Sequence, residues 1–247
     1  MNIDISDTKE ELGRRAAADA VAQIRGAITE RGTANVIVAT GASQFEVLSS
    51  LASAEEIAWS RVTFFHLDEY VGMPITHGAS FRRYLKERLV DQLPTSPDAF
   101  HYIDAEGNCQ ATCDRLGALI AEHPIDVALI GIGENGHLAF NDPPADFETE
   151  KPYLVVELDE ACRQQQLGEG WFDSLDEVPT QAISMSVRQI LKSSAIVCSV
   201  PDERKSIAVQ GAVEGPITPD VPASILRQHP RTTLYLDRPA ASRLSGE

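Results

Sequence analysis

The stretch IDVALIGIG, residues 125–133, decides the fold. It is a continuous apolar run that ends in glycines, which is typical of a strand buried on both faces. Working outward from it, other short apolar runs have the same character: NVIVAT (35–40), VTFFHL (62–67), SAIVCSV (194–200) and RTTLYLD (231–237). KPYLVVEL (151–158) and QAISMSV (181–187) are two further strand candidates.

Helical segments alternate with these strands. Periodic apolar positions or end signals predict helices over residues 8–31, about 44–54, 80–90, 108–122 and 203–215. This alternation predicts an α/β fold, a mostly parallel, Rossmann-like three-layer sheet with helices on both faces. We expect a single domain over residues 1–247, with a lid-like insertion over the irregular, proline-containing segment 142–180.

The composition excludes several classes of protein. The 247 residues include 21 Lys plus Arg and 37 Asp plus Glu, a net charge of −16, which argues against a nucleic-acid partner. No stretch approaches the roughly 18 apolar residues of a membrane helix, and the polar start MNIDISDTKEELGRR does not resemble a signal peptide. Four scattered cysteines predict a cytoplasmic protein without a disulfide framework: Cys109, Cys113, Cys162 and Cys198. Helical spacing explains the first pair more simply than a metal site.

Polar or glycine-rich sequence follows four of the predicted strands: TGAS (40–43), HLDEY (66–70), GIGENGH (131–137) and PDERK (201–205). Ligands of open parallel sheets bind beyond the carboxyl ends of the strands. We therefore expect these segments to converge on one site, as in an enzyme.

Two of these segments could bind an anion. Gly41, Ala42 and Ser43 lie between a strand and a helix, where backbone amides can hold a phosphate; the alternative is a plain turn in which the serine only caps the helix. Lys205 belongs to a pair of cations at a helix start, which the helix dipole disfavours unless an anion lies alongside. The alternative there is an ordinary surface helix.

The loop GIGENG (131–136) matches the glycine pattern of dinucleotide-binding proteins, but Pro143 and Pro144 prevent the helix that this fingerprint requires. The glycines make better sense as a loop that presents Asn135, His137 and Asp142. A carboxylate can hold an imidazole by one nitrogen and leave the other free for proton transfer. The alternative is a structural histidine in a turn.

Asp68 and Glu69 stand side by side at the end of a strand. Adjacent side chains of an extended chain point in opposite directions, so one acid could face the site while the other makes a structural contact. Their spacing does not rank them, and a solvated acidic turn is the alternative.

Five segments, in this order, resemble the glucosamine-6-phosphate deaminase/isomerase family: TGAS (40–43), HLDEYVGMP (66–74), GIGENGHLAFNDP (131–143), PDERKSIAVQGAVEG (201–215) and PASILRQHP (222–230). The similarity spans about residues 35–237. It implies aldose–ketose isomerisation of glucosamine 6-phosphate coupled to its deamination, which yields fructose 6-phosphate and ammonia. It implies no cofactor and no metal.

The resemblance also implies roles for individual residues. Asp68 would move a proton from C2 to C1, His137 would assist opening of the sugar ring, and Asp142 would orient it, with Asn135 beside them. The 6-phosphate would bind Ser43, the backbone near Gly41 and Ala42, and Lys205, with Arg163 as a further candidate. An amino-sugar phosphate is thus the expected partner, and a homo-oligomer is compatible with the resemblance.

The sequence departs from the family pattern at three places. Many members carry Asp at the position of Asn135, and others carry Glu at the position of Asp142. The lid also lacks a clear arginine at its expected position near Glu169. The galactosamine epimer is therefore an alternative substrate. A 6-phosphogluconolactonase is a second alternative, although that group typically has an arginine at the position of Tyr70. A non-catalytic sugar-phosphate sensor is a third.

Overall fold

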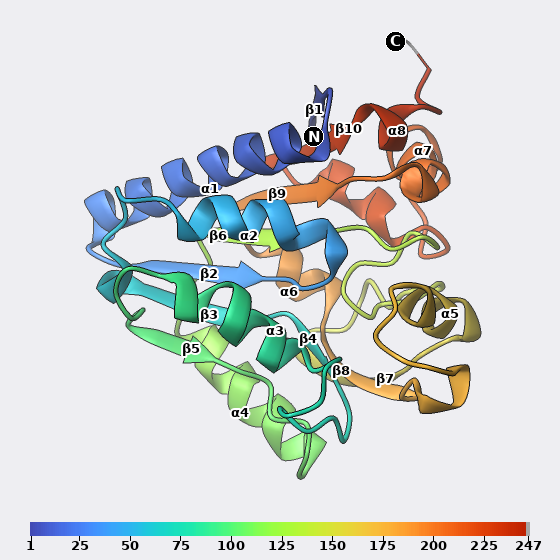
Figure 1. Ribbon diagram of the computed structural model, residues 1–247, viewed down its shortest axis with the longest axis horizontal. Helices are drawn as coiled ribbons and strands as arrows, with labels where there is room; N and C mark the ends of the chain where they lie inside the picture. Colours follow the sequence, from blue (N-terminus) through green and yellow to red (C-terminus); the bar gives the residue numbers. More distant parts are fainter. Residues whose placement is uncertain (246–247) are drawn as a thin grey trace.

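The computed structural model describes residues 1–245 and contains a seven-stranded main sheet (Figure 1). Its order is β1-β10-β9-β6-β2-β3-β5, and every neighbouring pair is parallel. The strands are β1 (Asn2–Ser6), β2 (Ala34–Val38), β3 (Val62–His66), β5 (Ala99–His101), β6 (Val127–Ile130), β9 (Ala195–Val200) and β10 (Thr232–Asp237). The predicted parallel α/β sheet is therefore confirmed. Two short edge strands, β1 and β5, were not predicted.

Helices cover both faces of this sheet. They are α1 (Lys9–Arg31), α2 (Phe45–Ala52), α3 (Phe81–Arg88), α4 (Cys109–Ala121), α5 (Glu160–Gly168), α6 (Val187–Leu191), α7 (Ser206–Glu214) and α8 (Arg238–Ala241). Short 3₁₀ helices are η1 (Ala42–Gln44), η2 (Trp59–Arg61), η3 (Val90–Gln92), η4 (Leu175–Glu177), η5 (Glu203–Lys205) and η6 (Pro222–Gln228). Among residues 1–245 no helix has the length and apolarity to cross a bilayer.

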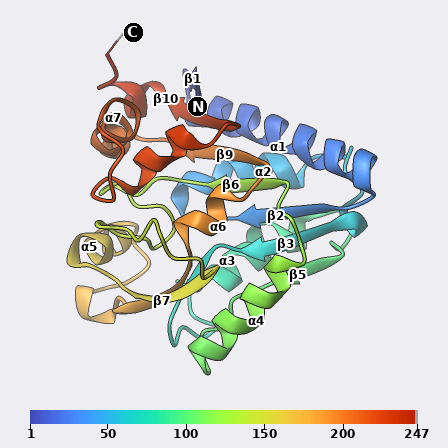
Figure 2. The same cartoon turned by 180° about the vertical axis from the view of Figure 1, so that it is seen from behind.

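Successive residues of a strand pack alternately into two separate hydrophobic cores, which explains the continuous apolar runs. In β2, Val36 and Val38 pack with α1 and α2 on one face, whereas Ile37 packs with α4, α6 and α7 on the other. Figures 1 and 2 show the sheet between these two helical layers. Burial on both faces is what a parallel sheet requires, so the three-layer prediction is confirmed.

The strand order reverses between β2 and β6. From β2 the chain continues outward through β3 to β5, then returns to β6 beside β2 and continues in the opposite direction through β9 to β10. Such a switch point leaves a crevice at the carboxyl ends of the two central strands. The loops 40–43 and 131–137 leave these two strands and therefore flank the crevice.

A small antiparallel sheet lies beside the main one, in the order β4-β8-β7. Its strands are β4 (Asp68–Tyr70), β7 (Tyr153–Glu157) and β8 (Gln181–Met185). The strands expected over 151–158 and 181–187 thus exist, but they do not join the parallel sheet. Only Leu67 separates β3 from β4, so the chain passes directly from one sheet into the other.

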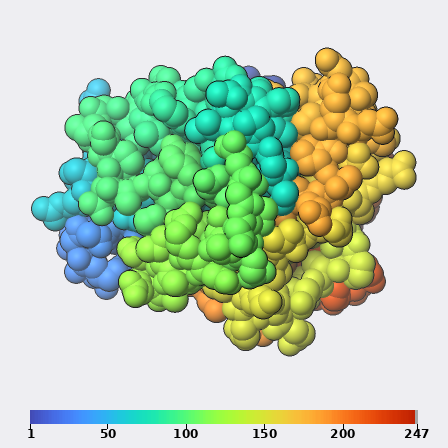
Figure 3. Space-filling model, turned by 90° about the horizontal axis from the view of Figure 1, so that it is seen from below, coloured from blue at the N-terminus to red at the C-terminus, as the bar shows by residue number. Residues whose placement is uncertain are grey.

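The segment 142–180 is less irregular than the sequence indicated, because it contains β7 and α5. Figure 3 shows these residues, in yellow to orange, packed beside the cyan and green residues that include α3 and α4. Strand β7 corresponds to the strand expected over 151–158, whereas α5 escaped prediction because prolines and glycines surround it.

Candidate active site

One cleft opens at the carboxyl ends of the central strands. All four polar segments that follow β2, β3, β6 and β9 contribute to its lining: Thr40, Gly41, Ala42, Ser43, Asp68, Gly131, Gly133, His137, Asp202, Arg204 and Lys205. The structure therefore brings together the segments that the strand-end argument placed at a common site.

The loop after β2 forms one end of the cleft. Gly41 has φ +91°, a conformation that strains any other residue, and its carbonyl accepts a hydrogen bond of 2.9 Å from Tyr84 Oη. The 3₁₀ helix η1 begins immediately afterwards, and the first amides of a helical segment lack intrahelical acceptors. Ser43 makes no capping hydrogen bond to η1 or α2, so the plain-cap interpretation of this serine fails.

Lys205 faces the same end of the cleft from η5. The residue is 5% exposed, and within residues 1–245 its ammonium group forms no hydrogen bond or ion pair. Burial lowers its pKa, which the carboxylates of Glu169 and Glu134 partly offset. A desolvated cation without a partner is costly, and an anionic ligand would supply the missing partner.

The backbone before this lysine is strained. Asp202 adopts φ +80°, an unusual value for a residue with a side chain, and its N–H donates to both carboxylate oxygens of Asp237 at 3.1 Å. Strain of this kind is concentrated at functional sites. Arg204 also lines the cleft, with its guanidinium 3.6 Å from the carboxylate of Glu134.

Asp68 lines the cleft from β4, where it pairs with Ser184 of β8, and we call the part of the cleft formed by Asp68 and His137 the acid–base end. Its carboxyl group makes no hydrogen bond within the described part of the chain, although the residue is buried. Burial, together with the neighbouring charge of Glu69, raises its pKa to about 8. A carboxylate that is desolvated and unpaired is a strong candidate for a general base.

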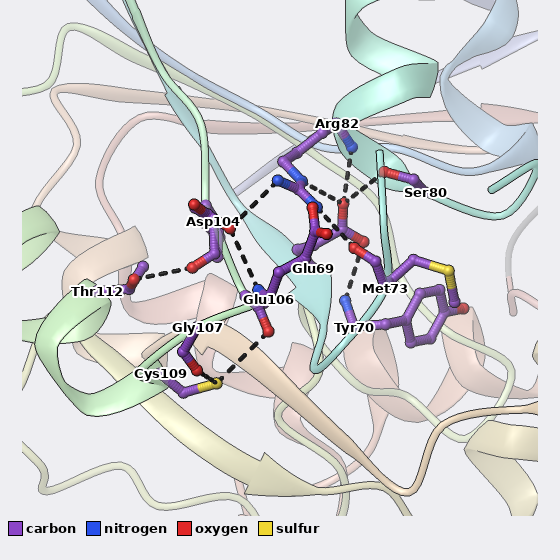
Figure 4. Close-up of polar contacts among 12 residues, drawn as sticks. Glu69, Tyr70, Met73, Ser80, Arg82, Asp104, Glu106, Gly107, Cys109 and Thr112 are labelled. Atoms are coloured by element: carbon purple, nitrogen blue, oxygen red, sulfur yellow. Dashed lines mark hydrogen bonds and ion pairs between the residues drawn. The ribbon is translucent and has the colours of Figure 1, made fainter. Parts of the chain in front are cut away.

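Glu69 does not line the cleft, and Figure 4 shows its carboxylate among Ser80 and Arg82. Its fully buried carboxylate accepts hydrogen bonds from Ser80 Oγ at 3.0 Å and from the backbone amides of Tyr70, Phe81 and Arg82 at 2.9–3.2 Å. Burial raises the pKa of this acid, and these hydrogen bonds oppose the rise. Glu69 therefore anchors the start of α3, which resolves the ranking of the two adjacent acids.

Arg82 closes the network behind this acid. Its Nε lies 3.5 Å from the Glu69 carboxylate, and its terminal nitrogens contact Asp104 at 3.3 Å and Glu106 at 2.7 Å and donate to the Met73 carbonyl at 2.6 Å. Figure 4 shows these contacts converging on one guanidinium. A multiply bonded buried guanidinium holds β4 and α3 together, and thereby fixes the strand that carries Asp68.

His137 lines the cleft, and a polar cluster supports it from behind. Its Nδ1 lies 3.0 Å from Oδ1 of Asp142, which also accepts a hydrogen bond of 3.1 Å from Asn135 Nδ2. Asn135 Oδ1 in turn accepts from the His137 amide at 3.1 Å. Burial alone would raise the pKa of Asp142, but the histidine and asparagine contacts lower it below its usual value.

The glycines of this loop allow neighbouring side chains to pack closely against its backbone. A Cβ at Gly133 would stand 2.2–2.4 Å from the His137 ring, and one at Gly131 would stand 3.0 Å from Ser43 Oγ. No helix follows them, because residues 131–141 form turns and loop. The prediction that these glycines do not open a helix is thus confirmed, and their spacing reflects how closely the loop packs against neighbouring side chains.

Helix α5 covers the cleft with a polar face that sequence reasoning missed. Gln165, Gln166 and Glu169 line the cleft, at helical spacings of one face. Gln166 Oε1 accepts a hydrogen bond of 2.6 Å from Tyr70 Oη, and Gln165 Oε1 accepts one of 2.8 Å from the Glu134 amide. Polar residues at positions i, i+1 and i+4 were the available signal.

The structure corrects the expectation for Arg163. This residue does not line the cleft, because its guanidinium donates to the carbonyls of Leu175 at 2.5 Å and Val178 at 3.1–3.2 Å. It ties α5 to the segment that follows and is no longer a candidate phosphate ligand.

Within residues 1–245, His137, Asp142 and Cys162 form the one cluster with metal-ligating potential, with ligand atoms within 4.8 Å of one another. Burial and the neighbouring carboxylates raise the pKa of the thiol. This environment favours the protonated form of the sulfur.

A buried carboxyl group, a carboxylate-supported imidazole and a buried lysine thus line one cleft at the switch point of an open α/β sheet, where ligands of this class of fold bind. The chain belongs to the family of glucosamine-6-phosphate isomerases and 6-phosphogluconolactonases, whose sequence profile matches residues 7–235.

Named relatives lie in both branches of this family. A glucosamine-6-phosphate deaminase of Streptococcus pneumoniae serotype 4 is 34% identical over 213 residues, or 86% of this chain and 89% of that protein. A solved structure of a monomeric glucosamine-6-phosphate deaminase has 31% identity and TM-score 0.88, covering 98% of this chain and 99% of its own. The 6-phosphogluconolactonase of Trypanosoma brucei, at 16% identity and TM-score 0.79 over 99% of this chain and 98% of its own, shows the shared fold.

Proposed function

We propose that this protein converts glucosamine 6-phosphate and water into fructose 6-phosphate and ammonia. The observation that carries the proposal is that Asp68 and His137 line one cleft with an unpaired, buried Lys205. Similarity at 31–34% identity to proteins named as glucosamine-6-phosphate deaminases supports the same substrate. The lactonases match only in fold, at 15–20% identity.

The proposal gives each end of the cleft a task. The phosphate binds the amides of residues 41–43 and Lys205, which places the sugar chain toward the acid–base end. His137, oriented by Asp142, transfers a proton at the ring oxygen as the sugar opens. Asp68 then takes the proton from C2 and returns one to C1 through an enolamine, which yields the 2-imine. Water adds to C2 of this imine, and the carbon–nitrogen bond breaks to release ammonia.

The positions around Tyr70 favour deamination over lactone hydrolysis. Its ring is fully buried among Phe81, Phe140 and Phe172, and its hydroxyl donates to Gln166. An arginine, which the lactonases typically have here, would place an unpaired charge in this aromatic cluster.

We also propose that the segment 142–180 acts as a lid. Gln165 and Gln166 of α5 line the cleft, and each accepts one hydrogen bond from a residue outside this segment. Helix α5 therefore covers the cleft through only a few polar side chains, which supports the role of a lid. A cytoplasmic location is supported by four free thiols, and a small-molecule rather than nucleic-acid partner by the net charge of −16. A homo-oligomer stays a prediction of the family resemblance.

The test is ammonium release from a panel of substrates. Glucosamine 6-phosphate, galactosamine 6-phosphate and 6-phosphogluconolactone are each supplied to the purified protein, with ammonium and fructose 6-phosphate measured for the first two and acid release for the third. We expect stoichiometric ammonium and fructose 6-phosphate from the glucosamine compound. Absence of ammonium at high enzyme concentration, with hydrolysis of the lactone, would contradict the proposal.

A further inference from the structure

An acidic side chain stands at the anion-binding end of the cleft. Glu169 follows the last residue of α5 and lines the cleft together with Gly41 and Lys205. Its Oε2 lies 3.7 Å from the point that a Cβ on Gly41 would occupy. Glu169 is therefore beside the loop whose amides are expected to bind phosphate.

Hydrogen bonds hold this carboxylate in place. Its Oε1 accepts a hydrogen bond of 3.2 Å from Gln165 Nε2, and the same glutamine accepts from the Glu134 amide at 2.8 Å. The acid is thus linked through one side chain to the loop that presents His137.

Among residues 1–245, no basic side chain forms an ion pair with this acid. Arg204 lies nearer to Glu134, at 3.6 Å, and to Asp202, at 4.0 Å. Lys205 forms no ion pair within residues 1–245, yet Glu169 is the strongest of the charges that raise its pKa. The ammonium group of Lys205 and the carboxylate of Glu169 therefore face the same part of the cleft without forming an ion pair.

We propose that Glu169 is an affinity-determining residue that competes with the substrate's phosphate for the anion-binding end of the cleft. This inference rests on the proposed function for the identity of the substrate, although any phosphate that binds here meets the same carboxylate. Two anions facing one partly buried cation repel each other, so the charge of Glu169 weakens phosphate binding. Tight binding then requires the end of α5 to move away from Gly41.

Substitution of the charge alone tests this proposal. In Glu169→Gln the side-chain amide oxygen can still accept from Gln165, while the charge is lost. Calorimetric titration with inorganic phosphate and with fructose 6-phosphate should give a Kd roughly fivefold lower than that of the unaltered protein. The difference should shrink at high salt because ions screen the repulsion. Glu169→Ala, which also removes the Gln165 contact, should change Kd in the same direction.

A matched control lies on the same helix. Glu160 is exposed in the first turn of α5, outside the cleft, so Glu160→Gln removes the same charge and should leave Kd unchanged. With glucosamine 6-phosphate, Glu169→Gln should lower KM by a larger factor than it changes kcat. An unchanged or higher Kd in Glu169→Gln would overturn the inference. The phosphate titration needs no turnover, so a protein that releases no ammonium refutes the proposed function while the titration still decides the role of Glu169.

Discussion

The two ends of the cleft are built in different ways. At the proposed anion-binding end, the amides of the β2 loop and Lys205 lie within short segments that each follow a strand of the main sheet. At the acid–base end, Asp68 belongs to the small sheet, and His137 depends on contacts with Asn135 and Asp142. The comparison teaches that the amides of a strand-end loop need only local geometry, whereas the raised pKa of Asp68 needs burial by distant parts of the chain. Four predictions test this distinction.

The largest expected effect is at the acid–base end. Asp68→Asn should lower kcat by about 10³-fold, since it removes the proton acceptor. Phosphate binding should survive because the opposite end of the cleft is untouched. Steady-state assays and hydrogen exchange at C2 in deuterated water measure the first effect, and fructose 6-phosphate titration measures the second. Retained exchange at C2 would remove Asp68 from its role as the base.

The second-largest effect is expected from a packing change that displaces the imidazole ring of His137. In Gly133→Ala the new methyl group would meet the His137 ring at 2.2–2.4 Å, so the ring must move. We expect kcat to fall by about 100-fold and the free energy of unfolding by about 1–3 kcal/mol, measured by kinetics and urea denaturation. The control is Gly26→Ala in α1, where a Cβ meets nothing within 4 Å. Equal activity losses in both variants would refute the packing argument.

A substitution at the anion-binding end of the cleft should mainly change KM. Lys205→Ala removes a charged hydrogen-bond donor worth about 1.5–3 kcal/mol, so KM should rise roughly 10- to 100-fold, with a smaller effect on kcat. Asn135→Asp should alter kcat more than KM because that residue supports His137. Lys192→Ala is the matched control, since this lysine is exposed and lies 3.7 Å from Glu150 on the surface. Similar KM values for the Lys205 and Asn135 variants would contradict the division of the cleft.

The smallest effect is expected from a change of pH. Because the pKa of Asp68 is raised to about 8, its basic form increases with pH, so kcat/KM should rise up to about pH 8. Stability should change in the opposite direction. The protonated acid suits its buried site, so its contribution is full below the ordinary value of 3.8 and is lost as pH rises to about 8. Asp68→Asn should abolish this loss in urea titrations, and an identical pH dependence in both proteins would contradict the burial argument.

Much of the fold followed from local pattern. The apolar runs around 125–133 predicted the central strands because strands covered on both faces carry almost no polar residues. The strand β4 could not be predicted, since Asp68–Tyr70 is short and polar and is held by pairing with β8, more than a hundred residues further along the chain. The same long-range pairing moved 151–158 and 181–187 out of the parallel sheet.

The sequence by itself determined the sheet, the four strand ends and the residue types that meet there, because hydrophobic periodicity and turn chemistry act over a few residues. Only the tertiary structure decided that Asp68 rather than Glu69 faces the cleft, that Arg163 turns away from it, and that Glu169 reaches it. Those choices depend on which distant groups bury or hydrogen-bond each side chain, and such partners are adjacent in space without being adjacent in the chain.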